Sequence, residues 1–251
     1  MDINILVATI SAITSVLVTI ISQMMIASKN RRFAKEKEVR SIQKQYINPL
    51  RFFLAENYFR IHKAVDKCRR PEDEKTVASI IADPVELLDK DLSWFAGNGC
   101  YLISNCYFTA CLLAMIEQIR VKIPYLRLSI RNDTRMMSLI NKIVIDFRYI
   151  ANVYYVIQMT IGRDVYLEDE QRLLTYREFC LQLQNSESLV WYRTLVWFYI
   201  TNANWEEDKI TGLLEDLKEL SDFLDRLVCG GNTINQKMKS EKDAGLLKHH
   251  V

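Results

Sequence analysis

Glycine and proline are scarce in this chain, with 7 and 4 copies among 251 residues. A β-sandwich or barrel needs a turn at about every 8–12 residues, and turns draw heavily on these two residue types. Hydrophobic residues make up 49% of the chain and charged residues 25%, the balance of a sequence that folds rather than one that stays disordered. The sequence therefore predicts an all-α protein.

Histidine is scarcer still, with three copies, two of which are His249 and His250 at the end of the chain. A serine or cysteine nucleophile usually needs an imidazole base, and only His62 could supply one. His62 lies on a predicted helix beside Lys63, where an exposed or packing role explains it. The chain also lacks a phosphate-binding glycine loop, a dinucleotide fingerprint and an HExxH motif. We therefore assign no catalytic residue and no cofactor.

The six cysteines do not form a CxxC pair, so their spacing predicts no structural zinc or other metal site. Cys100, Cys106 and Cys111 fall in an apolar run, and free cysteines in such runs are usually buried. We expect reduced thiols packed in a core, which fits a reducing compartment.

Charged residues are absent from Ile3 to Ser28. A helix of this length rises about 39 Å, enough to cross a hydrocarbon layer of about 30 Å. The start of the chain lacks the positive region of a signal peptide, and no convincing cleavage site follows Ala27 and Ser28. The sequence therefore predicts an N-terminal transmembrane helix that stays as a single-pass anchor.

Positive charge gathers directly after this apolar segment. Residues 28–44 hold seven Lys or Arg and two Glu, whereas residues 45–231 hold 22 basic and 26 acidic residues. The positive-inside rule then predicts an N-terminus outside and a cytoplasmic C-terminus. A nucleic-acid partner is not expected, because the excess of positive charge is not on the folded domain. The residues expected to contact lipid headgroups are Lys29, Arg31, Arg32, Lys35 and Lys37.

Small residues within the anchor recur at steps of 4, 3, 4 and 3, the spacing of one helical face. Small side chains let helices approach closely in lipid, so this face predicts a homo-oligomer. Thr9, Ser11 and Thr14 are also small, so chance spacing is the alternative. The candidate seam consists of Ala8, Ala12, Ser15, Thr19 and Ser22.

The chain divides into an anchor (1–28), a basic juxtamembrane helix (29–45), a cytoplasmic helical domain (46–231) and a disordered tail (232–251). Leu92 to Ile116 is uncharged and could be a second membrane span, but its Gly and Asn residues favour a buried central helix that begins near Gly99. Apolar periodicity and capping residues predict the domain's helices. Their expected ranges are 47–68, 76–82, 84–89, 99–116, 134–161 ended by Gly162, 168–184, 188–201 and 205–229.

Two further patterns could have marked a site. Acidic triplets at 168–170 and 206–208 are expected to begin helices, where carboxylates favour the positive end of the helix dipole. Five arginines interrupt apolar helical patterns, and without acidic partners they would form an anion pocket if they converged. These are Arg51, Arg60, Arg120, Arg148 and Arg193, with Glu56, Glu117 and Asp146 as expected partners.

These observations favour a membrane-tethered helical module that binds a protein or a small ligand and has no evident catalytic site. A pore-forming or membrane-perturbing protein, assembled through the anchors, is the alternative. An enzyme acting at the membrane surface is the third hypothesis. It is disfavoured because the sequence offers no evident catalytic base and no evident nucleophile.

Overall fold

The computed structural model describes residues 3–68, 80–126, 130–201, 204–228 and 233–243. Within these ranges, the side chains of residues 3–13, 35, 38–39, 42–43, 66–68, 123–126, 130 and 241–243 lie outside the description. The described chain is helical apart from turns and one short hairpin, so the all-α prediction is confirmed. Its internal packing separates two units, residues 1–45 and 46–251.

The first unit is built on α1 (Ile3–Ile42). Every side chain described between Thr14 and Ala34 is exposed, including eight large apolar ones from Val16 to Ile26. A single π-helical turn, η1 (Gln43–Ile47), follows in the chain. Pro49 comes two residues later and cannot donate a backbone hydrogen bond, which accounts for the altered helical turn before it.

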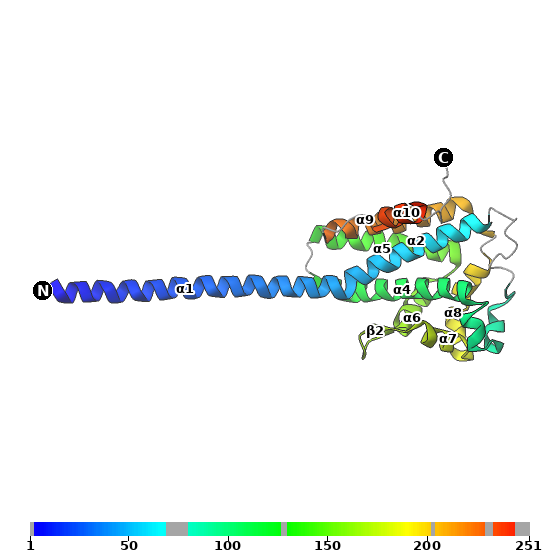
Figure 1. The fold of residues 1–251 in the computed structure, drawn as a ribbon, viewed down its shortest axis with the longest axis horizontal. Helices are drawn as coiled ribbons and strands as arrows, with labels where there is room; N and C mark the ends of the chain where they lie inside the picture. Colours follow the sequence, from blue (N-terminus) through cyan, green and yellow to red (C-terminus); the bar gives the residue numbers. More distant parts are fainter. Residues whose placement is uncertain (1–2, 69–79, 127–129, 202–203, 229–232, 244–251) are drawn as a thin grey trace. The chain divides into compact units, whose positions relative to one another are not determined.

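The second unit is a bundle of helices with one small hairpin (Figure 1). Its strands β1 (Tyr166–Leu167) and β2 (Arg172–Leu173) pair antiparallel. Its helices are α2 (Asn48–Cys68), η3 (Pro84–Asp89), α3 (Leu92–Ala96), α4 (Cys100–Leu126), α5 (Ile130–Ala151), α6 (Tyr155–Val165), α7 (Tyr176–Leu183), α8 (Ser186–Ile200), α9 (Glu207–Leu227) and α10 (Thr233–Asp243).

Helix α4 lies at the centre of this bundle and packs against α2, α6, α7 and α8 (Figure 1). All its side chains from Thr109 to Ile119 are buried. Among the described side chains, Cys100–Lys122 is the stretch long and apolar enough to cross a membrane, and 72% of its most apolar window is buried by other helices. The prediction of a buried central helix is confirmed.

The prediction of one helix over 134–161 is wrong in one respect, because the structure has two helices there, α5 and α6. Asn152 has φ 53°, a left-handed conformation that Asn tolerates better than most residues, and it separates α5 from α6. Buried Gln158 donates to Val144 O at 2.8 Å and to Val153 O at 2.7 Å, which ties the two helices together across the break.

Gly162 does not end a helix, as the sequence had suggested, but lies inside α6. A Cβ at this position would lie 2.9 Å from Leu113 O of α4. The glycine therefore permits the close approach of α6 to the central helix, a tertiary role that the sequence pattern of one helix cannot reveal.

The helix predicted over 168–184 begins later, at Tyr176, so this prediction is also wrong in part. The acidic triplet 168–170 lies in the turn of the hairpin and not at a helix start. Thr175 and Glu178 form a capping box that fixes the first turn of α7, and Arg172 pairs with Glu178 at 2.8 Å. The helix predicted at 76–82 falls mostly outside the described residues.

The prediction of disorder from residue 232 is wrong for residues 233–243, which form α10. Asp225 of α9 accepts a hydrogen bond from Thr233 N at 2.7 Å, at the start of this helix. Ile234 is fully buried against Ala55 and Phe59 of α2. The capped start, the apolar contacts of Ile234 and Met238 and the ion pair of Lys237 with Glu56 order a segment whose sequence is otherwise polar.

A charged cluster joins α5 to α9. Lys142 donates to Asp216 at 3.3 Å and to Glu219 at 2.9 Å, and Arg135 also pairs with Glu219. Burial and the nearby Asp216 carboxylate raise the pKa of Asp146 to about 6, although Lys142 opposes the shift. The folded state therefore binds this proton more tightly than the unfolded state does. The contribution of protonated Asp146 to the free energy of unfolding is fully present below its unfolded pKa and is lost as pH rises through about 6.

We expect Asp146→Asn to raise the melting temperature at pH 8 by about twice as much as at pH 5, since Asn imitates the neutral acid and pH 5 lies between the unfolded pKa of about 3.9 and the folded pKa of about 6. After solvent screening the gain is about 1 kcal/mol. This corresponds to about 2–4 °C for a domain of this size. Thermal unfolding measured at both pH values checks it, with exposed Asp169→Asn as the control. An equal change at both pH values would contradict the assignment.

Candidate functional site

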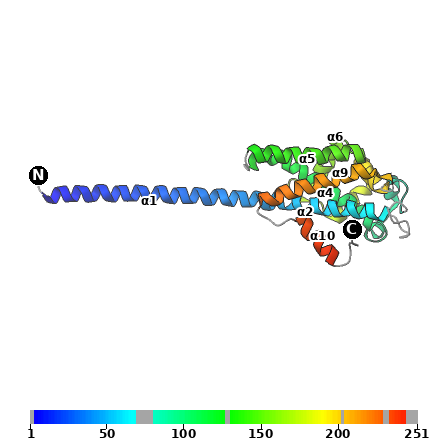
Figure 2. The same cartoon turned by 90° about the horizontal axis from the view of Figure 1, so that it is seen from above.

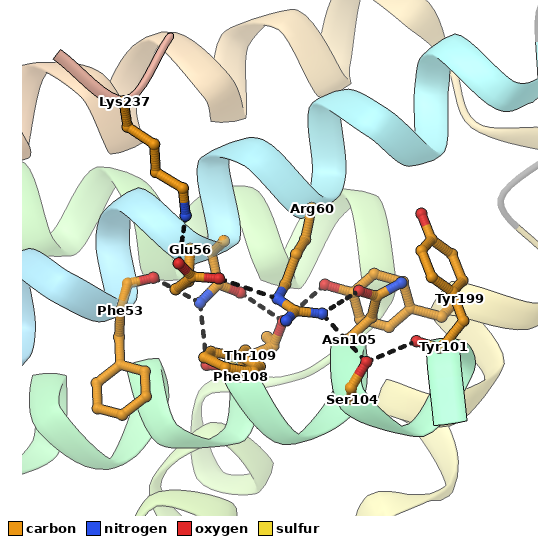
Figure 3. Close-up of polar contacts among 11 residues, drawn as sticks. Phe53, Glu56, Arg60, Tyr101, Ser104, Asn105, Phe108, Thr109, Tyr199 and Lys237 are labelled. Carbon is orange, nitrogen blue, oxygen red and sulfur yellow. Dashed lines mark hydrogen bonds and ion pairs between the residues drawn. The ribbon is translucent and has the colours of Figure 1, made fainter. Parts of the chain in front are cut away.

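A network of polar side chains joins α2, α4, α8 and α10 around Arg60 (Figure 3). Arg60 Nη1 donates to Ser104 Oγ at 3.1 Å and to Asn105 Oδ1 at 3.0 Å. Its guanidinium carbon lies 3.9 Å from the ring centroid of Phe108, a cation–π contact, and Nε lies 3.4 Å from Glu56. One arginine of α2 is thereby held against one face of α4.

A second chain of hydrogen bonds lies beside it and is fully buried. Asn57 Nδ2 donates to Phe53 O at 2.7 Å and to Phe108 O at 2.9 Å. Thr109 Oγ1 donates to Asn57 Oδ1 at 2.6 Å and lies 2.6 Å from the Tyr199 hydroxyl of α8 (Figure 3). Burial raises the pKa of Tyr199 well above its ordinary value, so the hydroxyl stays protonated.

Glu56 connects this network to α10 (Figure 3). Its carboxylate forms ion pairs with Arg60 of its own helix and with Lys237 of α10. Lys237 Nζ also lies 4.9 Å from the ring centroid of Phe59. The ammonium group therefore has both an anion and an aromatic face, and α10 is tied to the same residues that hold α2 on α4.

A groove of about 330 Å³ lies between α2 and α9. Its apolar lining comes from both helices, and carboxylates and an ammonium group stand among these side chains. His62, the histidine within the described residues, belongs to this groove and not to the Arg60 network. The lining residues are Tyr58, His62, Val65, Glu207, Ile210, Thr211, Leu214, Glu215 and Lys218.

These two features offer different chemical groups. The Arg60 network consists of amide, hydroxyl, guanidinium and carboxylate groups that bond to one another across helices, while Asn105 Nδ2 and Arg60 Nε are buried without a hydrogen-bond partner among the described residues. The groove offers apolar surface with charges at fixed places, the composition of a binding site. Across the described residues no three His, Cys, Asp or Glu side chains are grouped as metal ligands.

The predicted seam lies on α1. Ser15, Thr19 and Ser22 are exposed, whereas the side chains of Ala8 and Ala12 lie outside the described residues. Thr19 Oγ1 donates to Ser15 O at 2.8 Å, so this hydroxyl has an acceptor within its own helix. Self-association through this face stays a prediction.

The predicted lipid contacts also lie on α1. Lys29, Arg31, Arg32 and Lys37 are exposed, and the side chain of Lys35 lies outside the described residues. Four exposed cations within nine residues keep a headgroup-binding role open to experiment.

The cysteines and arginines of the sequence analysis have ordinary packing roles where they are described. Cys106 and Cys111 are buried as expected, and so is Cys180, whereas Cys100 at the start of α4 is only partly buried; burial raises the pKa of Cys111 to about 12. The five arginines have separate partners and do not form one anion pocket. Arg51 pairs with Asp225, Arg60 with Glu56, Arg120 with Asn141, Arg148 with Tyr149 and Tyr154, and Arg193 with Asp83.

Sequence reasoning missed the Asn57, Thr109 and Tyr199 chain and the groove around His62. Each of these three residues is a single polar side chain within an apolar helical pattern. That isolation is the one sequence signal that could have indicated a buried hydrogen bond. A scan against protein-family models, a search of curated proteins and a search of solved structures give no match to this chain.

We expect Thr109→Val to lower the free energy of unfolding by about 1–3 kcal/mol, because it leaves Asn57 Oδ1 and the Tyr199 hydroxyl buried with a partner lost. Urea unfolding followed by tryptophan fluorescence measures it. Thr160→Val is the matched control, since that hydroxyl bonds only to the helical carbonyl of Val156 near the surface. Equal effects of the two changes would show that the chain is not needed for stability.

Proposed function

We propose that this chain is a single-pass membrane protein whose N-terminal helix tethers a cytoplasmic helical binding module. The main observation behind this proposal is that eight large apolar side chains of α1 are exposed. The exposed fraction of each lies between 47% and 68%. These are Val16, Leu17, Val18, Ile20, Ile21, Met24, Met25 and Ile26.

The physical argument is the cost of leaving these side chains in water. Burial of one such side chain in an apolar medium is worth roughly 1.5–3 kcal/mol. Eight together exceed the whole stability of many domains, about 5–15 kcal/mol. A hydrocarbon layer buries all sides of a helix at once, which suits an exposure that is not confined to one face of α1.

The basic flank supports the orientation. Lys29, Arg31 and Arg32 follow the apolar stretch directly, and Asp2 precedes it. Positive residues are retained on the cytoplasmic side, which puts the second unit there. The binding role rests on the groove between α2 and α9, the concave surface in which apolar and charged groups meet.

We expect a reporter fused after Val251 to be cytoplasmic: a fluorescent protein should fluoresce, and an alkaline phosphatase, which needs export, should stay inactive. The matched control replaces Lys29, Arg31 and Arg32 with Glu, which should weaken this orientation because three of the seven basic residues of the flank are removed. Phosphatase activity of the unaltered chain would overturn the topology. It would also revive the Leu92 to Ile116 segment as a second span.

A second candidate function, assembly of anchors into an oligomer or pore, is favoured by Ser15, Thr19 and Ser22, which are all exposed on α1 at steps of 4 and 3. Helix pairs in lipid are held by close packing, because lipid tails are as apolar as the side chains themselves. A large side chain on the contacting face would therefore separate the helices.

We expect Ser15→Leu to reduce cross-linked oligomers of the full chain in membranes severalfold. Ser15→Ala should be tolerated, since each interhelical hydrogen bond is worth only about 0.6 kcal/mol. Val16→Leu tests a neighbouring face. The bond from Thr19 goes to the backbone of Ser15, so all three changes leave it in place. Equal yields for the unaltered chain and Ser15→Leu would make the anchor a passive tether.

A further inference from the structure

Helix α10 is an amphipathic helix docked on α2 and α9 of its own chain (Figure 2). Ile234 is fully buried with Ala55 and Phe59, and Met238 packs against the same cluster one turn later. Lys237 stands between these two and pairs with Glu56. The contacting residues thus fall at i, i+3 and i+4, the pattern by which an amphipathic helix occupies a groove.

The start of α10 is held by a partly buried ion pair between Arg51 of α2 and Asp225 of α9. Arg51 Nε donates to Asp225 Oδ1 at 2.6 Å, and Arg51 Nη2 donates to Thr233 Oγ1 at 3.0 Å. Thr233 N and Oγ1 both donate to Asp225, at 2.7 and 2.9 Å. This junction fixes the end of α2 and the end of α9 at which the docked helix begins.

The surface that α10 occupies continues beyond it. On α2, positions 51, 55, 58, 62 and 65 follow steps of 4 and 3, and on α9 positions 207, 211, 214 and 218 do the same. Residues at these steps share one face of a helix. Tyr58 contacts the α10 cluster and also lines the 330 Å³ groove. One trough therefore runs along both helices, with α10 on one part and the groove on the other.

We propose that the groove between α2 and α9 is a docking site for a lysine-bearing amphipathic helix of a partner protein, of the same type as α10. The distance from Tyr58 to Val65 is about 10 Å along a helix, so the occupant contributes about two turns. Two apolar side chains at i and i+4 would pack on Leu214 and Val65. The lining holds two carboxylates and one ammonium group, that of Lys218, and Glu215 would pair with a lysine of the occupant as Glu56 pairs with Lys237.

The inference deepens the proposed binding role and does not depend on the anchor. The probe is a fluorescein-labelled 14-residue peptide, two copies of the sequence Ile234–Ser240 (INQKMKS), added to the full chain in detergent micelles. Binding is measured by fluorescence anisotropy. We expect saturable binding that Thr211→Arg weakens at least tenfold, because it places bulk and positive charge at an exposed position of the groove.

The matched control is Ser138→Arg, the same added charge on an exposed position of α5, which should bind the peptide as the unaltered chain does. A peptide with all lysines replaced by glutamate should bind at least tenfold more weakly. Absence of peptide binding would overturn the proposal. Equal binding by Thr211→Arg would also overturn it, since the peptide would then be displacing α10 or entering the micelle. Membrane insertion is scored by the reporter fusions, so the two failures are distinguishable.

Discussion

The burial of α4 around its whole circumference is the constraint on which the second unit depends. Between Thr109 and Ile119 every side chain is buried, so neighbouring helices must cover this helix on every side. Helices α2, α6, α7 and α8 do so, and Gly162 lets α6 approach most closely because a side chain there would meet the α4 backbone. The other elements attach to this arrangement: α9 packs on α2 and α5, and α10 on α2 and α9.

The polar side chains buried in a central helix need hydrogen-bond partners from the protein, because the neighbouring helices exclude water. Asn105 and Thr109 are buried in α4; Asn105 Oδ1 accepts from Arg60 and Thr109 donates to Asn57, both of α2, whereas Asn105 Nδ2 has no partner within the described part of the chain. Burial of an amide or hydroxyl without such a partner would cost about 1–3 kcal/mol. Arg60 and Asn57 therefore do more than join two helices, because they restrict which pairings of α2 and α4 are tolerable.

The sequence predicted what depends on local patterns. The ranges of α2, α8 and α9 follow from apolar periodicity and capping residues, and the burial of α4 follows from its long uncharged run. The errors occurred where distant contacts decide the outcome. Gly162 was read as a helix end because the pattern of one helix does not include the neighbour that requires a glycine. The order of α10 depends on Asp225 and Phe59, which are not adjacent to it in the sequence.

The candidate site was less predictable than the fold for the same reason. Glu56 and Arg60 are four residues apart and pair as a helix surface predicts, but neither Lys237 nor Asn105 can be inferred from that spacing. The groove is still harder to predict from the sequence, since it is lined by α2 and α9 together and depends on how these two helices align along their axes. Arg51 with Asp225 joins α2 to α9 at one end, and the Arg60 network separately holds α2 on α4. Buried polar contacts are often no more stabilising than apolar ones of equal volume, but they penalise every misaligned packing. The polar contacts that hold α2 on α4 and on α9 therefore help to bring His62 into one groove with Ile210 and Thr211.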